Sequence, residues 1–151
     1  MPYSKEQIKN ADWKRLSKVK ELKDATLWGT SGILPGDINQ GPVGTCWFLA
    51  AAACLADKHT DAIKQVFETD KVKGGYAVNL FALGVPQTTA IDDYIPFIDG
   101  KPMSVQISED KSLWPMLLEK ALAKMQGNYY TIAGSWAGWG VRHIYGTPRE
   151  W

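Results

Sequence analysis

The sequence is poor in the features that mark several common classes of protein. It has two cysteines among 151 residues, too few for a disulfide framework, and its formal net charge of +1 disfavours nucleic-acid binding driven by bulk charge. Its longest apolar run, residues 46–56, has eleven residues, whereas a membrane-spanning helix needs about 20. The polar N-terminus lacks the apolar core of a signal peptide. We therefore expect no membrane span, no nucleic-acid partner and a cytoplasmic location.

The remaining composition is that of a globular protein with its own core. Hydrophobic residues make up 45% and charged residues 22% of the chain, and the length suits one domain. Ser4 is placed to cap a helix, with Gln7 in the capping-box position. The lysine-rich stretch from residue 5 to 23 then predicts an N-terminal helical segment over residues 1–28. Residues 29–151 are expected to form the main body of the same domain.

Along the main body, a loop rich in glycine and proline over residues 29–45 gives way abruptly to the apolar run that begins at Cys46. That run has no helix breaker and is apolar on all sides, which predicts a central helix buried on nearly every face. Further helices are expected over residues 60–67, 114–126 and 141–145, and strands over 76–83 and 88–95, with a hairpin signal at Asp99-Gly100. The predicted fold class is α+β, mainly helical, with one small antiparallel sheet.

The segment Gln40-Gly41-Pro42-Val43-Gly44-Thr45-Cys46-Trp47 carries the chemistry. Backbone N–H groups and the dipole at a helix start favour an anion, so the thiolate of Cys46 is favoured as a nucleophile. Attack on an amide carbonyl creates an oxyanion, which needs donors already in place. The Cys46 N–H and the Gln40 side-chain amide are candidates. Gly44 leaves room for a peptide, and Trp47 is placed to shield the site from water.

This segment resembles the nucleophile loop of the calpain-type cysteine proteases, within the papain-like group. The pattern Gln-Gly-x-x-Gly-x-Cys-Trp-Phe-Leu-Ala-Ala matches, and Trp13-Lys14-Arg15 is similar to an upstream calpain segment. The helix from Trp114 to Lys124 is similar to the family's second signature helix. Gly127-x-Tyr129 and Tyr145-Gly146-Thr147-Pro148 follow in the expected order. The resemblance covers almost the whole chain.

The resemblance implies that Cys46 is the nucleophile of an endopeptidase and Gln40 an oxyanion-hole donor. It also implies that the chain is the first subdomain of a calpain core, with the catalytic His and Asn in a second, mostly β subdomain supplied in cis or in trans. Substrate would dock near Gly134 and Ser135, where the family usually has two glycines. Thr45 stands where the family usually has Asp, which leaves specificity open.

The two histidines and the second cysteine are assigned structural roles. His59 lies thirteen residues after Cys46, roughly 20 Å away along a continuous helix. His143 is expected to be a surface or packing residue, because no Asn follows it to orient its ring. Cys54 would lie about 12 Å from Cys46 on one helix, too far for a disulfide, and is interpreted as a small buried residue. Without a base, the isolated chain should be nearly inert towards peptides.

Calpains also bind calcium in this half, and by resemblance Asp37 matches one carboxylate ligand and Gly32 a carbonyl donor. The second carboxylate position falls on Ser112, with Asp110 or Glu109 as substitutes, and loss of a carboxylate weakens a calcium site. Two other readings stay open. One is a non-catalytic calpain-like interaction or regulatory module, and the weaker one is a calcium-sensing module around Asp37.

Overall fold

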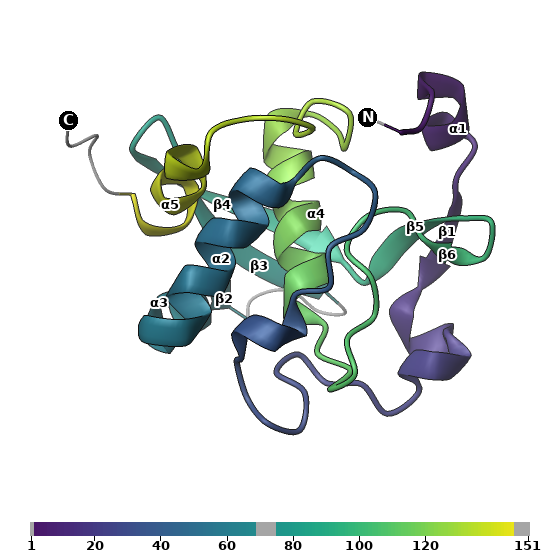
Figure 1. Ribbon diagram of the computed structural model, residues 1–151, viewed down its shortest axis with the longest axis horizontal. Helices are drawn as coiled ribbons and strands as arrows, with labels where there is room; N and C mark the ends of the chain where they lie inside the picture. Colours follow the sequence, from purple (N-terminus) through teal and green to yellow (C-terminus); the bar gives the residue numbers. More distant parts are fainter. Residues whose placement is uncertain (1, 69–74, 147–151) are drawn as a thin grey trace.

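The computed structural model describes residues 2–68 and 75–146, and these residues form an α+β fold (Figure 1). They contain five α-helices and two three-stranded antiparallel sheets. The helices are α1 (Lys5–Lys9), α2 (Cys46–Lys58), α3 (Thr60–Val66), α4 (Trp114–Gln126) and α5 (Ala137–Tyr145), and the strands are β1 (Asp12–Arg15), β2 (Phe67–Glu68), β3 (Gly75–Ala82), β4 (Val85–Asp92), β5 (Tyr94–Ile98) and β6 (Lys101–Pro102). No helix in the described ranges is both long and apolar enough to cross a bilayer.

Several predicted boundaries are confirmed because they depend on local signals. Helix α2 begins at Cys46, where the glycine- and proline-rich loop ends. Helix α4 begins at Trp114 and ends before Gly127, whose φ of +115° suits glycine. Ser4 and Gln7 form the expected capping box at α1. Thr147 and Pro148, which belong to the last quoted motif, lie outside the described residues.

The N-terminal segment is not the helix that the sequence predicts. Helix α1 ends at Lys9, β1 pairs with β5, and two 3-10 turns follow, Leu16–Lys18 and Lys20–Leu22. The core side chains Leu16, Val19 and Leu22 recur every three residues, a spacing that 3-10 turns satisfy as well as an α-helix does. These residues join the same hydrophobic core as α2 and α4, so residues 1–28 are neither helical throughout nor packed separately.

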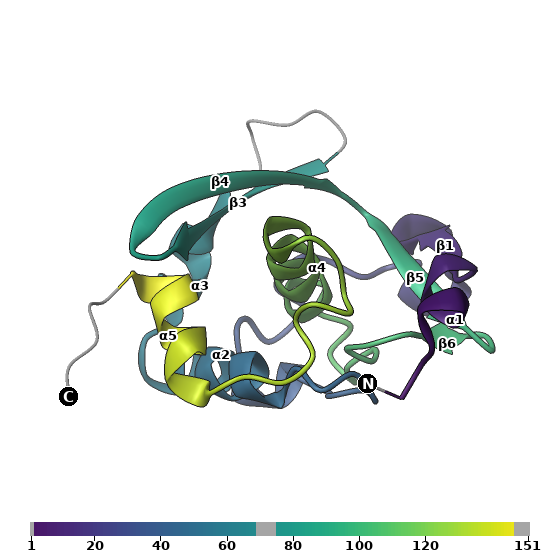
Figure 2. The same cartoon turned by 90° about the horizontal axis from the view of Figure 1, so that it is seen from above.

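Two sheets replace the single small sheet that was expected. Strands β2, β3 and β4 form one sheet, and β1, β5 and β6 form the other. Figure 2 shows β4 running on into β5 as one long curved ribbon that arches over α4. The second sheet was missed because β1 comes from the segment predicted to be helical. The α+β class is confirmed, whereas a predominance of helix stays a prediction.

The most enclosed helix is α4 and not α2. Helix α4 lies between the arch of β3 and β4 and the layer formed by α2 and α5 (Figure 2), and its residues from Trp114 to Ala123 are all buried. Helix α2 leaves Cys46, Ala50 and Cys54 exposed along one stripe, and Asp57 and Lys58 exposed at its C-terminal end. The interpretation of Cys54 as buried is therefore wrong. An all-apolar helix of small residues does not reveal which face meets solvent, because alanine tolerates both environments.

The packing of α5 on α2 predicts opposite effects for two glycines of one helix. A Cβ at Gly140 would lie 2.7 Å from the Ala51 Cβ and 2.9 Å from the Trp47 carbonyl oxygen. We expect Gly140→Ala to lower the free energy of unfolding by about 1–3 kcal/mol, the usual cost of overpacking. Thermal denaturation followed by circular dichroism measures the change.

The matched control is Gly138→Ala in the same helix, where a Cβ would meet nothing within 4 Å. Alanine favours helix over glycine by up to about 1 kcal/mol, so this variant should melt at or above the wild-type temperature. Equal melting temperatures for the two variants would contradict the α2–α5 packing.

Candidate active site

Cys46 is exposed at the first position of α2. The helix begins there because the Thr45 carbonyl accepts the N–H groups of Phe48 and Leu49, each at 3.0 Å. The N–H groups of Cys46 and Trp47, the first two residues of the helix, have no acceptor inside it. An accessible thiol thus lies beside backbone donors that are directed away from the helix. This is the local arrangement that the sequence predicts for a nucleophile.

The residue before the nucleophile is anchored in the interior. Thr45 is completely buried, and its hydroxyl donates to Glu119 Oε1 of α4 over 2.5 Å. Its N–H donates to the carbonyl of Val43, another completely buried residue, at 2.7 Å. Thr45 therefore anchors the nucleophile loop to the protein interior, while the sulfur of the next residue, Cys46, stays at the surface.

Gln40 lies on the surface of the same loop, with the backbone on both sides of it fixed. The Asn39 carbonyl accepts the Gln106 N–H at 2.7 Å. A Cβ at Gly41 would lie 1.8 Å from the Ser104 carbonyl oxygen, so only glycine fits there. The Gln40 side chain itself is exposed. Its amide is thus presented on a rigid support.

The structure brings the four predicted substrate-binding residues, Gly44, Trp47, Gly134 and Ser135, into one region. Gly134 N–H donates to the Gly44 carbonyl at 2.7 Å, which ties the nucleophile loop to the segment after α4. The Trp47 indole N–H donates to the Ile132 carbonyl at 2.9 Å in the interior. Trp47 therefore fastens this same segment, and it is buried rather than spread over the surface as a shield. Ser135 is exposed and lines a cavity that Trp47 also lines.

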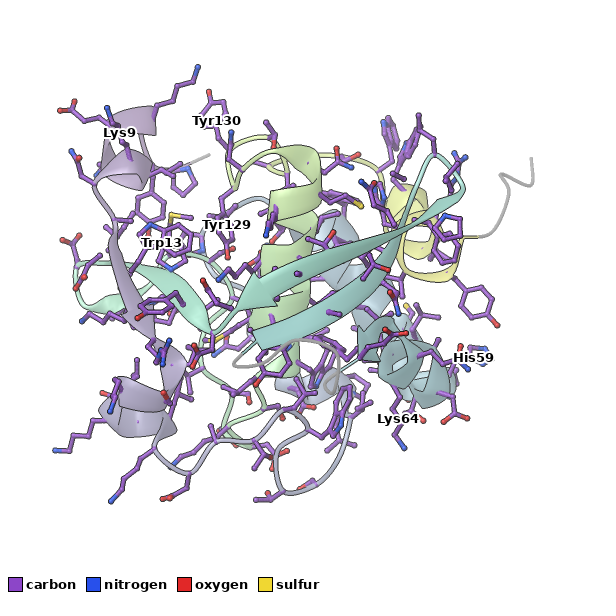
Figure 3. All side chains as sticks on the ribbon, turned by 180° about the vertical axis from the view of Figure 1, so that it is seen from behind. Lys9, Trp13, His59, Lys64, Tyr129 and Tyr130 are labelled. Atoms are coloured by element: carbon purple, nitrogen blue, oxygen red, sulfur yellow. The ribbon has the colours of Figure 1, made fainter. Side chains whose placement is uncertain are left out.

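Among the described residues, no hydrogen bond or ring contact joins either histidine to Cys46. His59 caps the C-terminal end of α2 and lies on the outer surface at its junction with α3 (Figure 3). His143 is buried, with Nδ1 2.7 Å from the Phe81 carbonyl oxygen and its ring edge-on to Trp47 at 5.9 Å between centroids. Because a carbonyl can only accept, Nδ1 carries the proton. The ring packs in the interior, in line with the predicted role of His143.

Glu119 is the residue of this region to which the sequence interpretation assigned no role. It is 1% exposed, and burial raises the pKa of its carboxyl group although three hydrogen bonds oppose the shift. A signal existed in the sequence, because α4 is apolar on nearly every side of Glu119 and Lys120. Charged residues inside such a helix are expected to be buried and to need partners.

Comparison with known proteins agrees with this arrangement. The family model described as "Calpain family cysteine protease" matches residues 1–150. The chain belongs to the calpain family of cysteine proteases. It is 34% identical to the calpain-1 catalytic subunit of Homo sapiens over 92% of this chain and 20% of the relative. It is 31% identical to the calpain-2 catalytic subunit of Bos taurus over 99% of this chain and 21% of the relative. The chain thus spans about a fifth of the curated relatives it matches.

The calcium site implied by the resemblance to calpains does not find a fitting set of side chains. Asp37 is 2% exposed, and its Oδ2 accepts the Leu34 N–H and the Trp114 indole N–H, each at 2.9 Å. Ser112, at the position of the second carboxylate ligand, is buried, and its hydroxyl donates to Asp110. The described residues contain no group of three or more His, Cys, Asp or Glu that could hold a metal ion.

Asp110 is engaged as well, since its carboxylate accepts hydrogen bonds from Thr30, Ser31 and Ser112. These bonds lower the pKa of this surface carboxyl. Gly32 has a φ of +78° in the loop between these residues and Asp37. Asp37 thus acts as an internal hydrogen-bond acceptor, and this engagement argues against the calcium site that the resemblance implies, which stays untested.

We expect calcium to leave the melting temperature unchanged, because a calcium ion wants six to eight oxygen ligands and Asp37 is already occupied. Thermal scans with calcium, with magnesium at equal ionic strength and with chelator measure this. A saturable rise with calcium alone that disappears in Asp37→Asn would contradict the expectation.

The two cysteines allow an internal comparison of reactivity. Both are free and exposed on one face of α2, but Cys46 lies at its N-terminus and Cys54 in its later half. We expect iodoacetamide to alkylate Cys46 faster, because the helix start stabilises the thiolate. Peptide mapping by mass spectrometry after timed quenching gives both rates in one sample. Equal rates would favour a purely structural role for Cys46.

Proposed function

We propose that this chain is the nucleophile-bearing half of a calpain-like cysteine endopeptidase, with the papain-like first subdomain of the protease core. The observation that carries the proposal is the exposed Cys46 thiol at the start of α2, on a loop anchored beneath it by Thr45. Family membership and the surrounding residues agree with this reading. The substrate class is protein or peptide.

The proposed reaction begins with attack of the Cys46 thiolate on a peptide carbonyl carbon. A carbon–sulfur bond forms, and the carbonyl π electrons move to oxygen. The oxyanion is held by the Cys46 N–H and by the Gln40 amide, whose support is fixed at Asn39 and Gly41. Collapse of the intermediate breaks the carbon–nitrogen bond, and the leaving amine takes a proton from the base. Water then hydrolyses the thioester.

Substrate docking is assigned to Gly134 and Ser135, in the segment after α4 that is hydrogen-bonded to the nucleophile loop at Gly44. Gly134 N–H is already used by Gly44. The Gly134 carbonyl and the Ser135 N–H are then the groups offered to an extended substrate backbone. Both residues are exposed, and the Ser135 side chain occupies the position of a second glycine. We expect a narrower cleft here than two glycines would leave.

The base and its orienting residue are assigned to a second subdomain, supplied in cis or in trans. The placement of His59 and His143 supports this assignment, as does the much greater length of the curated relatives. By this proposal the isolated chain has little peptidase activity, because a nucleophile without a base is weak. A cytoplasmic location stays a prediction.

The alternative function is a non-catalytic calpain-like interaction or regulatory module. The observation in its favour is exposed aromatic surface on the last segment of the fold, where Trp136, next to Ser135, is 80% exposed and Tyr145, at the end of α5, is 53% exposed. Large exposed aromatic residues are typical of interfaces. The two functions differ in whether Gln40 and Cys46 act together on a carbonyl group.

A peptidyl aldehyde tests that joint action without needing a base. Its addition to Cys46 creates the same oxyanion, so the aldehyde should protect Cys46 from iodoacetamide and leave Cys54 unprotected. Gln40→Ala should weaken the protection by about tenfold or more, because one oxyanion donor is lost. Gln87→Ala, an exposed glutamine of β4, is the matched control and should leave protection unchanged.

Equal protection of both thiols, or no effect of Gln40→Ala, would favour the interaction module. Casein hydrolysis tests the missing base, and the chain alone should show almost none. Activity of the isolated chain that is lost in His143→Ala would overturn the assignment of the base to another subdomain.

A further inference from the structure

We infer that Glu119 is a positioning residue, whose buried carboxylate holds the nucleophile Cys46 and the oxyanion donor Gln40 in register with one another. The inference rests on the proposed function of those two residues. Glu119 touches neither of them in the described hydrogen-bond network and acts through the segments that carry them.

The first segment is the start of α2. Thr45 donates its hydroxyl to Glu119 Oε1 over 2.5 Å and is bonded through its peptide group to Cys46. Thr45 has no exposed surface, so water cannot replace this acceptor without opening the core. Displacing Thr45 would therefore shift the helix start and the direction of the Cys46 N–H.

The second segment is the strap formed by residues 104–106, which supports the loop around Gln40. Ser104 donates its hydroxyl to Glu119 Oε1 at 2.6 Å, and the Val105 N–H donates to Oε2 at 3.2 Å. On its other side the strap meets the loop at Gly41, through the Ser104 carbonyl, and at Asn39, through the Gln106 N–H. Gly41 thus lies against Ser104, which Glu119 binds directly, and Asn39 is bonded to Gln106, the residue that follows Val105 in the strap.

A carboxylate suits the network best, because it can accept from all three donors at once. An ionised carboxylate only accepts, whereas the amide of a glutamine would turn a donor towards one of these groups. No neighbouring cation is bonded to the Glu119 carboxylate in the described part of the chain. Lys120 donates instead to Asp92 and to the Tyr94 carbonyl, and buried Tyr129 has its pKa raised by burial and by the charge of Glu119. The buried Glu119 carboxylate is therefore stabilised by the hydrogen bonds from Thr45, Ser104 and Val105.

If Glu119 only stabilises the fold, loss of the Thr45 hydroxyl and loss of the Ser104 hydroxyl should affect the site equally. Thr45 and Ser104 both donate to Oε1, and both are buried, so Thr45→Val and Ser104→Ala each remove one hydroxyl donor from the same oxygen. Only Thr45 is joined directly to Cys46. A positioning role therefore predicts that the two variants differ at the site even where their stabilities agree.

The experiment measures protection of Cys46 by the peptidyl aldehyde, with Cys54 as the internal reference and melting temperature recorded for each variant. We expect Glu119→Gln and Thr45→Val to weaken protection about tenfold or more, since small misplacements at a reacting centre are costly. Ser104→Ala should weaken it much less, because Val105 still holds the strap. Thr45→Ser, which keeps the hydroxyl, should restore protection close to the wild-type level.

Equal losses in Thr45→Val and Ser104→Ala, or loss in Thr45→Ser as large as in Thr45→Val, would overturn the positioning role. Amide hydrogen exchange gives a readout that does not depend on chemistry at Cys46. In Glu119→Gln, exchange should accelerate in residues 40–46 and 104–106 together, and unchanged exchange there would also overturn the inference.

The failure of the proposed function has a different signature. In that case the wild-type chain itself shows no selective protection of Cys46, and the exchange measurement decides the remaining point. If amide exchange in Glu119→Gln accelerates in both segments, Glu119 still links them. If exchange accelerates in neither segment, Glu119 does not link them and the inference fails. Should Glu119→Gln fail to fold, the Thr45 and Ser104 variants still separate the outcomes.

Discussion

The convergence of three hydrogen bonds on the buried Glu119 carboxylate is the interaction on which the arrangement of the site depends. A charge in the interior is costly unless donors surround it, so the segments that supply the donors have little freedom. Those segments are the start of α2 and the strap 104–106. The surface that carries Cys46 and Gln40 is thus defined by a polar contact beneath it.

Helix α4 makes this possible because it is enclosed between the curved sheet and α2 (Figure 2). Its successive residues face different neighbours. Glu119 reaches the nucleophile loop, Lys120 reaches the corner between β4 and β5, and Trp114 reaches Asp37. The aromatic contact of Trp13 with Tyr129, 6.4 Å between centroids, joins β1 to the segment after this helix (Figure 3). One helix therefore connects most parts of the fold.

Local signals in the sequence were sufficient for α2, α4 and the turn at Asp99-Gly100, because breakers and caps act on their immediate neighbours. The strand predicted over residues 88–95 instead spans the end of β4 and the start of β5, which belong to different sheets. Local signals were also insufficient for the N-terminal segment, where the spacing of Leu16, Val19 and Leu22 suits more than one kind of turn. The strand β1 depends on pairing with β5, which is distant in the sequence. The exposure of Cys54 depends on which face of α2 the neighbouring elements cover.

The sequence by itself was enough to place the chain in its family and to predict a cysteine at a helix start with a glutamine six residues before it, since motif and spacing lie within one short stretch. Tertiary structure alone decided that Gly134 bonds to Gly44, that His143 packs in the interior and that Glu119 lies beneath the site. The physical reason is that these contacts join residues far apart in the chain. Their hydrogen-bond partners are chosen by packing, which no local pattern records.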